Sequence, residues 1–129
     1  MSGLTAAAES QGAAKARRST GGFVAVVEEL RTKGSLTIKE VANLTGVDDR
    51  QAQRWAAGTS EPAGASLHRL LDANFIVREL LEVYEPEGVR IWLHSRNRAL
   101  ADQRPIDVAA TGDFEPVLAA VRRLVHGND

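Results

Sequence analysis

The sequence has no cysteine, and its 129 residues include four prolines, one methionine and 5% aromatic residues. The lack of cysteine excludes a disulfide framework, a thiolate zinc site and a cysteine nucleophile. No apolar run approaches the roughly 20 residues of a membrane-spanning helix, so no membrane partner is expected. Neither sign of charge dominates, because 16 basic and 17 acidic residues give a formal net charge of −1. That balance excludes a strongly basic surface for coating nucleic acid.

The rest of the composition is that of an ordinary globular protein, with 43% hydrophobic and 26% charged residues. The length predicts one domain, or one domain with a small appendage. The three histidines, at positions 68, 94 and 126, are too scattered to indicate a metal site, and no cofactor is implied. Arg17-Arg18 precedes an apolar stretch, Phe23–Val27, that is too short for a cleavable export signal. A cytoplasmic location is therefore expected.

Residues 1–20 are rich in alanine, glycine and serine and lack apolar periodicity, which predicts a mobile tail. A weak phosphate-binding arm that uses Lys15, Arg17 and Arg18 is the alternative. Beyond this segment, apolar residues recur at helical spacing and no alternating strand pattern occurs, so the expected fold class is all-α. Glycines and prolines divide the pattern into helices. The first expected helix contains Phe23 and ends before Gly34. The next ones cover 38–45, 49–57, 65–84, 87–100 and 105–110, and a last helix follows Gly112.

Residues 37–57 are predicted to form two short helices joined by a tight turn at Gly46, the arrangement of a helix-turn-helix. Thr37 and Glu40 form a capping-box pattern for the first helix, and Asp48 is a typical cap for the second. Gly46 tolerates the positive φ that the turn requires. An ordinary helical hairpin is the alternative. The apolar residues that lock the two helices together are expected to be Val41, Val47, Ala52 and Trp55, with core packing as the simplest role of the tryptophan.

In a helix-turn-helix, the second helix presents Arg50, Gln51, Gln53 and Arg54 outward. Arginine and glutamine are the side chains that read guanine and adenine edges in the major groove. Thr37 and Lys39 lie where such motifs meet phosphates, so these six residues are the candidate DNA contacts. Asp49 opposes binding because its carboxylate repels the DNA backbone. Solvated charges on a helix surface are the alternative for the two arginines.

A second pattern occupies residues 86–127: a helix with Trp-Leu, an asparagine, a leucine, a proline, a short helix, a glycine and a final apolar helix. Together with the segment 47–62, it resembles the MbcA/ParS/Xre antitoxins, in which an Xre-type helix-turn-helix precedes a toxin-binding domain. The resemblance covers about 36–127 in the expected order. Arg96 departs from it, because the family often has proline before the asparagine. The matching positions are Trp92, Leu93, Asn97, Leu100, Pro105, Gly112 and Val117.

The resemblance implies an antitoxin of a type II toxin–antitoxin system. The family's partners are RES-domain toxins that deplete NAD, and the antitoxin neutralises them by covering the NAD pocket. The implied partners are therefore a RES-domain toxin and operator DNA through which the antitoxin regulates its own operon. The long helix expected at 65–84 also carries more large apolar residues than three short helices can cover, which predicts a homodimer. A higher hetero-oligomer with the toxin is expected as well.

Four polar residues surround an apolar helix end in the second pattern and are the candidate toxin contacts. For Asn97 the alternative is a local cap of the loop before Pro105. The pair Arg122-Arg123 is read as a solvated face near a helix C-terminus, where cations are favoured. The candidate toxin contacts are Arg96, Asn97, Arg98 and Arg104.

The predicted organisation is a tail at 1–20, a helix-turn-helix part at 21–62, a linking and dimerisation helix at 63–85 and a toxin-binding domain at 86–129. No nucleophile–base pair or convergent acid–base set occurs in the sequence, so an enzyme is not expected. A stand-alone helix-turn-helix regulator without a toxin partner is the main alternative, and a structural helical module is another. A RES-domain reading frame beside this one distinguishes the antitoxin from the stand-alone regulator.

Overall fold

A computed structural model describes residues 23–127 of the chain. The tail predicted at 1–20 lies outside these residues, as do 21–22 and 128–129. In the described part, regular secondary structure is helical apart from one isolated antiparallel bridge between Asn97 and Gln103. The all-α prediction is confirmed.

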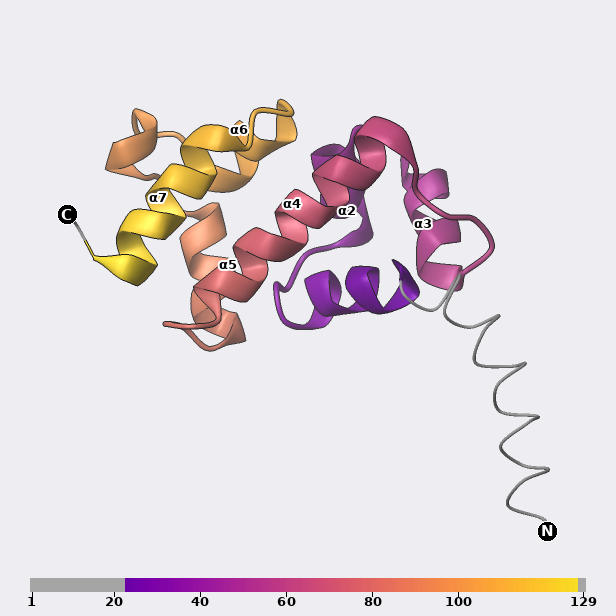
Figure 1. Ribbon diagram of the computed structural model, residues 1–129, viewed down its shortest axis with the longest axis horizontal. Coiled ribbons are helices and arrows are strands. Elements are labelled where there is room, and N and C mark those ends of the chain that lie inside the picture. The colour runs from indigo at the N-terminus through magenta and orange to yellow at the C-terminus, as the bar shows by residue number, and fades with distance from the viewer. Residues whose placement is uncertain (1–22, 128–129) are drawn as a thin grey trace, which may run out of the picture.

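The helices follow one another through short connections (Figure 1). Pro86, Pro105 and Pro116 each lie in the first turn of a helix, where a missing backbone N–H leaves no hydrogen bond unmade. Residues 23–32 are helical, and the later elements are α2 Ile38–Thr45, α3 Asp49–Ala57, α4 Gly64–Leu80, α5 Pro86–His94, the 3-10 helix η1 Arg98–Leu100, α6 Pro105–Ala110 and α7 Glu115–His126.

The helices α2 and α3 begin and end where the sequence predicts, and they have 8 and 9 residues. The Thr37 hydroxyl accepts from the Glu40 backbone N–H at 3.0 Å, and Glu40 Oε1 accepts from the Thr37 N–H at 2.9 Å, so the capping box is formed. Asp48 caps α3 by accepting from the Gln51 N–H at 2.8 Å. Gly46 ends α2 at a φ of 81°, in the left-handed region that favours glycine.

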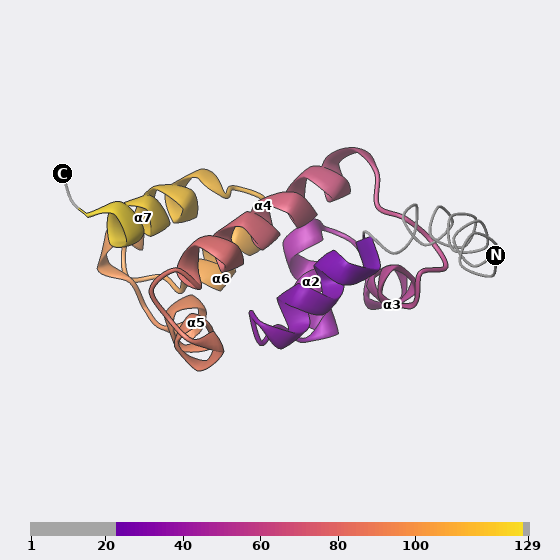
Figure 2. The same ribbon diagram turned by 60° about the horizontal axis from the view of Figure 1, so that its bottom comes forward.

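The helix α4 runs through the middle of the molecule and connects its two ends (Figures 1 and 2). It packs against α2, which precedes it in the sequence, and against α7, which follows it. Leu70 near its middle and Leu80 at its C-terminal end are fully buried, so the core extends along the second half of the helix. The helix ends at Leu80, short of the predicted end at 84, because the following N–H groups close tighter turns ahead of Pro86. Because α4 connects the two ends of the molecule, α3 lies at one end and α5 with α7 at the other (Figure 1).

The prediction of a continuous helix over 87–100 is wrong for the second half of that range, because α5 ends at His94. Asn97 provides the physical reason: its Oδ1 accepts from the Ala99 N–H at 2.9 Å and caps η1. Short polar side chains that hydrogen-bond to nearby backbone in this way favour turns over continued helix. Leu100 is still buried, but it reaches the core from η1.

Candidate functional site

The outward face of α3 carries the predicted DNA contacts. Arg50, Gln53 and Arg54 are exposed. Gln51 is partly buried instead, because its Nε2 donates to Ser60 Oγ at 2.9 Å and its Oε1 accepts from Arg54 Nη1 at 2.9 Å. Gln51 therefore orients Arg54 and ties α3 to the loop after it, a positioning role that the sequence did not indicate.

The predicted phosphate contacts at the start of α2 are unequal. Thr37 uses its hydroxyl in the capping box, whereas Lys39 is exposed and forms no ion pair within residues 23–127. Asp49 opens α3 and is also exposed, next to Arg50. The candidate DNA surface therefore has a low net positive charge.

Trp55 holds α3 against α2 and the core. The side chain is 1% exposed, and its indole N–H is buried with no hydrogen-bond acceptor among the described residues. A buried donor without a partner costs stability, so the contribution of this residue comes from packing its ring. This agrees with the core role that the position of Trp55 beside Ala52 predicts.

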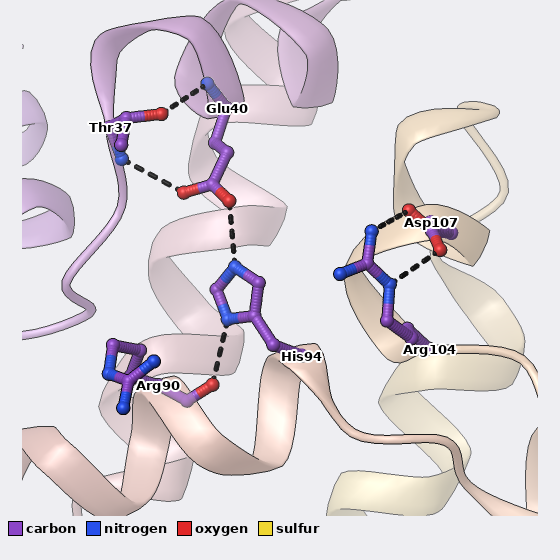
Figure 3. Close-up of polar contacts among 6 residues, drawn as sticks. All are labelled: Thr37, Glu40, Arg90, His94, Arg104 and Asp107. Carbon is purple, nitrogen blue, oxygen red and sulfur yellow. Dashed lines mark hydrogen bonds and ion pairs between the residues drawn. The ribbon is translucent and has the colours of Figure 1, made fainter.

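The predicted toxin contacts lie in the loop after α5, and two of them are already engaged within the chain. Arg104 donates from Nε and Nη2 to the Asp107 carboxylate at 2.8 and 2.9 Å (Figure 3). The hydrogen bonds from Arg104 hold the pKa of Asp107 below its usual value. Arg96 Nη1 donates to the Asp102 carbonyl oxygen at 3.4 Å. These two arginines therefore have internal partners that a toxin must compete with.

The other two predicted toxin contacts differ from each other. Asn97 is the local cap that the sequence left open as its alternative role, since its Oδ1 is bonded to the Ala99 N–H. Arg98 is exposed and forms no ion pair in the part of the chain that the structure describes. Among the remaining motif positions, Leu93, Leu100 and Pro105 are buried, Trp92 is partly buried, and Gly112 has a φ of 96°.

An ion pair joins α2 to the end of α5 (Figure 3). Glu40 Oε2 lies 2.7 Å from His94 Nε2, and His94 Nδ1 lies 2.8 Å from the Arg90 carbonyl oxygen. Both ring nitrogens of His94 therefore lie within hydrogen-bond distance of an oxygen atom. Burial raises the pKa of Glu40, but the hydrogen bonds from His94 and Thr37 together outweigh burial and lower that pKa below its ordinary value of 4.5.

The lowered pKa of Glu40 makes the stability of the fold depend on pH. The charged form is favoured in the folded chain, so its stabilisation is present above the ordinary pKa of 4.5 and is lost as the pH falls through the lower folded value. We expect Glu40→Gln to flatten the fall in unfolding free energy as the pH drops below about 5. Glutamine also closes a capping box, so the variant removes mainly the charge. Urea unfolding at a series of pH values measures this, with Glu61→Gln as the control at an exposed position without an ion pair in the described part.

Arg69 on α4 is a second tie between α2 and the C-terminal helices, and no sequence pattern pointed to it. Its Nε donates to the Leu44 carbonyl at 2.8 Å and its Nη2 to the Ala110 carbonyl at 3.1 Å. One guanidinium thus caps the C-terminal ends of both α2 and α6, where helix dipoles favour a cation. A β-carbon on Gly46 would lie 2.7 Å from Nη1 of Arg69, and one on Gly112 would lie 3.4 Å from the same atom. The absence of a side chain at these two turns therefore lets their backbone lie close to the guanidinium.

The described part of the chain contains neither a candidate metal site nor a candidate membrane-spanning helix. Between residues 23 and 127, no three side chains of histidine, aspartate or glutamate gather where a metal ion would fit. None of the helices in that range has both the length and the apolar character that crossing a bilayer requires.

Comparison with known proteins relates this arrangement to toxin–antitoxin systems. Residues 77–127 match the antitoxin Xre/MbcA/ParS C-terminal toxin-binding domain. The chain is 33% identical over 102 residues to a probable mycobacterial cidal antitoxin of Mycobacterium tuberculosis, covering 79% of this chain and 86% of that protein. It is 29% identical over 92 residues to the mycobacterial cidal antitoxin MbcA of Mycobacterium tuberculosis, covering 71% and 81% of the two chains.

The fold is also similar to a solved structure. A chain in the crystal structure of the MbcT–MbcA toxin–antitoxin complex of Mycobacterium tuberculosis aligns with a TM-score of 0.68 at 26% identity. The alignment covers 80% of this chain and 93% of that chain, so it extends across both ends of the molecule.

Proposed function

The chain belongs to the Xre/MbcA/ParS antitoxin family, and on this basis we propose that it is the antitoxin of a type II toxin–antitoxin system. The toxin we propose is a RES-domain protein that degrades NAD, which the antitoxin silences by covering the NAD pocket. The observation that carries the proposal is the similarity to antitoxins over 79% of the chain, together with the match of residues 77–127 to a toxin-binding domain. The chain itself then acts by binding, without a catalytic reaction of its own.

The separation of the two candidate surfaces supports a two-part antitoxin. The helix α3 and the helices α5 and α7 lie at opposite ends of the molecule (Figure 1). A toxin bound to residues 86–129 would leave the outward face of α3 accessible. Co-purification of this chain with the RES-domain protein encoded beside it tests the toxin partner. Absence of a complex when both are co-expressed would favour the stand-alone regulator.

We further propose that α3 binds operator DNA, with affinity gained from several copies on half-sites spaced about one helical turn apart. Arg54 is exposed and oriented by Gln51, so Arg54→Ala is expected to cost about 1–3 kcal/mol of DNA-binding free energy per half-site.

Lys39→Ala is expected to weaken the affinity for all DNA sequences equally and to reduce the slope of log affinity against log salt concentration by about one. Asp49→Asn is expected to tighten binding, because it removes a carboxylate that repels phosphate.

A salt-series mobility shift on the native promoter fragment measures these effects, with and without toxin. Random DNA of the same length is the control. If neither the free chain nor the toxin complex prefers the promoter at low salt, α3 does not read DNA.

We also propose a homodimer through the exposed side of α4. Leu71 and Phe75 lie one turn apart on this helix and are 46% and 47% exposed, although both are large apolar side chains. Covering such a pair against a second copy removes apolar surface from water. Light scattering at micromolar concentration is expected to show a dimer for the natural chain and a monomer for Phe75→Glu. A stable monomer of the natural chain would contradict the proposal.

A further inference from the structure

Two grooves border the loop from 96 to 104, and they differ in how far their charges are already paired. The first is lined by Arg96, Asp102, Gln103, Arg104 and Asp107, and in it the arginines have the internal partners described above. The second is formed by the end of α5, η1 and the last turns of α7, and we call it the α5–α7 groove. It is lined by Trp92, Asn97, Ala99, Ala120, Arg123 and Leu124.

The α5–α7 groove has an apolar part that the chain leaves uncovered. Leu124 is 37% exposed, and Trp92 is only partly buried. Ala120 lies one helical turn before Leu124 on α7 and is itself buried, so the uncovered apolar surface is that of Leu124 and Trp92. Exposed apolar surface of this kind, rimmed by polar groups, is typical of a protein-binding site.

The polar groups of this groove are hydrogen-bond donors that have no acceptor among residues 23–127. Arg123 is exposed, and no carboxylate within residues 23–127 lies within ion-pair distance of it. Asn97 uses its Oδ1 to cap η1, which leaves its side-chain N–H groups as donors. Two donors beside an apolar surface fit a ligand that carries an acceptor, and a guanidinium pairs most strongly with a carboxylate.

The wall of the groove is held in place before any partner arrives. The Asn97 N–H donates to the Gln103 carbonyl at 3.0 Å, and the Leu100 N–H donates to the Asn97 carbonyl at 2.9 Å. With the side-chain cap to Ala99, these bonds fix both the backbone and the side chain of Asn97. Binding to a surface that is already ordered loses less conformational entropy.

We propose that the α5–α7 groove binds an acidic, amphipathic segment of the toxin, with an apolar side chain against Trp92 and Leu124 and a carboxylate on Arg123. The inference rests on the proposed function and names the surface that performs it. It moves the contact away from Arg96 and Arg104 and gives a partner to Arg123, which the sequence alone assigned to a solvated face. Every residue of the groove lies within the stretch 77–127 that matches a toxin-binding domain.

The test is the affinity of the purified full chain for the purified RES-domain toxin proposed as its partner, measured by titration calorimetry. Arg123→Glu is expected to weaken binding by at least about 30-fold, because it places a carboxylate opposite a carboxylate. Leu124→Ser is expected to weaken it by at least about tenfold. Arg122→Glu is the matched control, since it makes the same charge change on the neighbouring exposed residue, which does not line the groove. This control is expected to change the affinity by less than about fivefold. Circular dichroism and thermal unfolding show that each variant is folded.

Each result decides for or against the groove. Equal losses for Arg122→Glu and Arg123→Glu would show a general field effect and overturn the inference. Losses for Arg96→Gln and Arg104→Gln, with Arg123→Glu and Leu124→Ser unchanged, would place the contact in the first groove and would also overturn it. Both results leave the proposed function intact. Failure of the natural chain to bind the RES-domain protein would instead contradict the proposed function, and the groove inference with it.

Discussion

Replacing Trp55 by alanine is expected to lower the free energy of unfolding by about 3–5 kcal/mol. The side chain is 1% exposed and is the large apolar residue that fixes α3 on the core, so truncation leaves a cavity behind the helix. Total stabilities of small domains are only about 5–15 kcal/mol, so this loss is a large part of the whole. Urea unfolding followed by circular dichroism measures it. The operator binding proposed for α3 should fall with it, because α3 presents Arg54.

The matched control is Trp55→Phe. The indole N–H of Trp55 has no acceptor among the described residues, so phenylalanine loses ring volume but no hydrogen bond. We therefore expect it to cost much less than alanine. A phenylalanine variant as unstable as the alanine variant would show that the indole N–H contributes a hydrogen bond after all. A loss below about 1 kcal/mol for alanine would contradict the buried position of the ring.

Replacing Arg69 by methionine is expected to lower the free energy of unfolding by about 3 kcal/mol, because the two shorter of its three charge-assisted hydrogen bonds contribute at least about 1.5 kcal/mol each. The carbonyls of Leu44 and Ala110, at the C-terminal ends of α2 and α6, lose their donor together. Methionine keeps most of the length of the side chain, so the variant removes mainly the guanidinium. Thermal and urea unfolding measure the change.

Arg78→Met is the control on the same helix. Arg78 forms a single ion pair with Glu29 at 3.3 Å, and its side chain is 67% exposed. An exposed pair contributes about 0–1 kcal/mol, so this variant should be close to the natural chain. Equal effects of the two substitutions would mean that the Arg69 contacts to the helix ends add nothing beyond an ordinary surface arginine.

Local chemistry predicted the elements from α2 to α3 correctly, because each end is fixed by residues close in sequence. The capping box of Thr37 with Glu40, the cap at Asp48 and the left-handed Gly46 all act within four residues of the backbone they satisfy. The same reasoning failed over 87–100, where the side chain of Asn97 bonds to the backbone and ends the helical run. Apolar periodicity continued through that stretch and did not reveal the turn.

The ties between distant parts of the chain were not predictable from sequence. Arg69 reaches carbonyls 25 and 41 residues away, and Glu40 meets His94 at a separation of 54 residues. An arginine or histidine at a helical position looks like a solvated charge until the fold brings an acceptor to it. The same limit applies to the candidate toxin contacts. The sequence grouped Arg104 with Asn97, whereas the structure pairs Arg104 with Asp107 and leaves Arg123 beside Asn97 in the α5–α7 groove.

The intracellular NAD level tests most directly whether this chain is an antitoxin. The RES-domain toxin proposed as the partner is induced in bacterial cells with the full chain, or with a frameshifted copy that makes no protein, and NAD and growth are followed together. We expect NAD to collapse and growth to stop in cells with the frameshifted copy, whereas the full chain keeps both at the level of uninduced cells. An equal fall of NAD with and without the chain, at confirmed expression of both proteins, would contradict the antitoxin role.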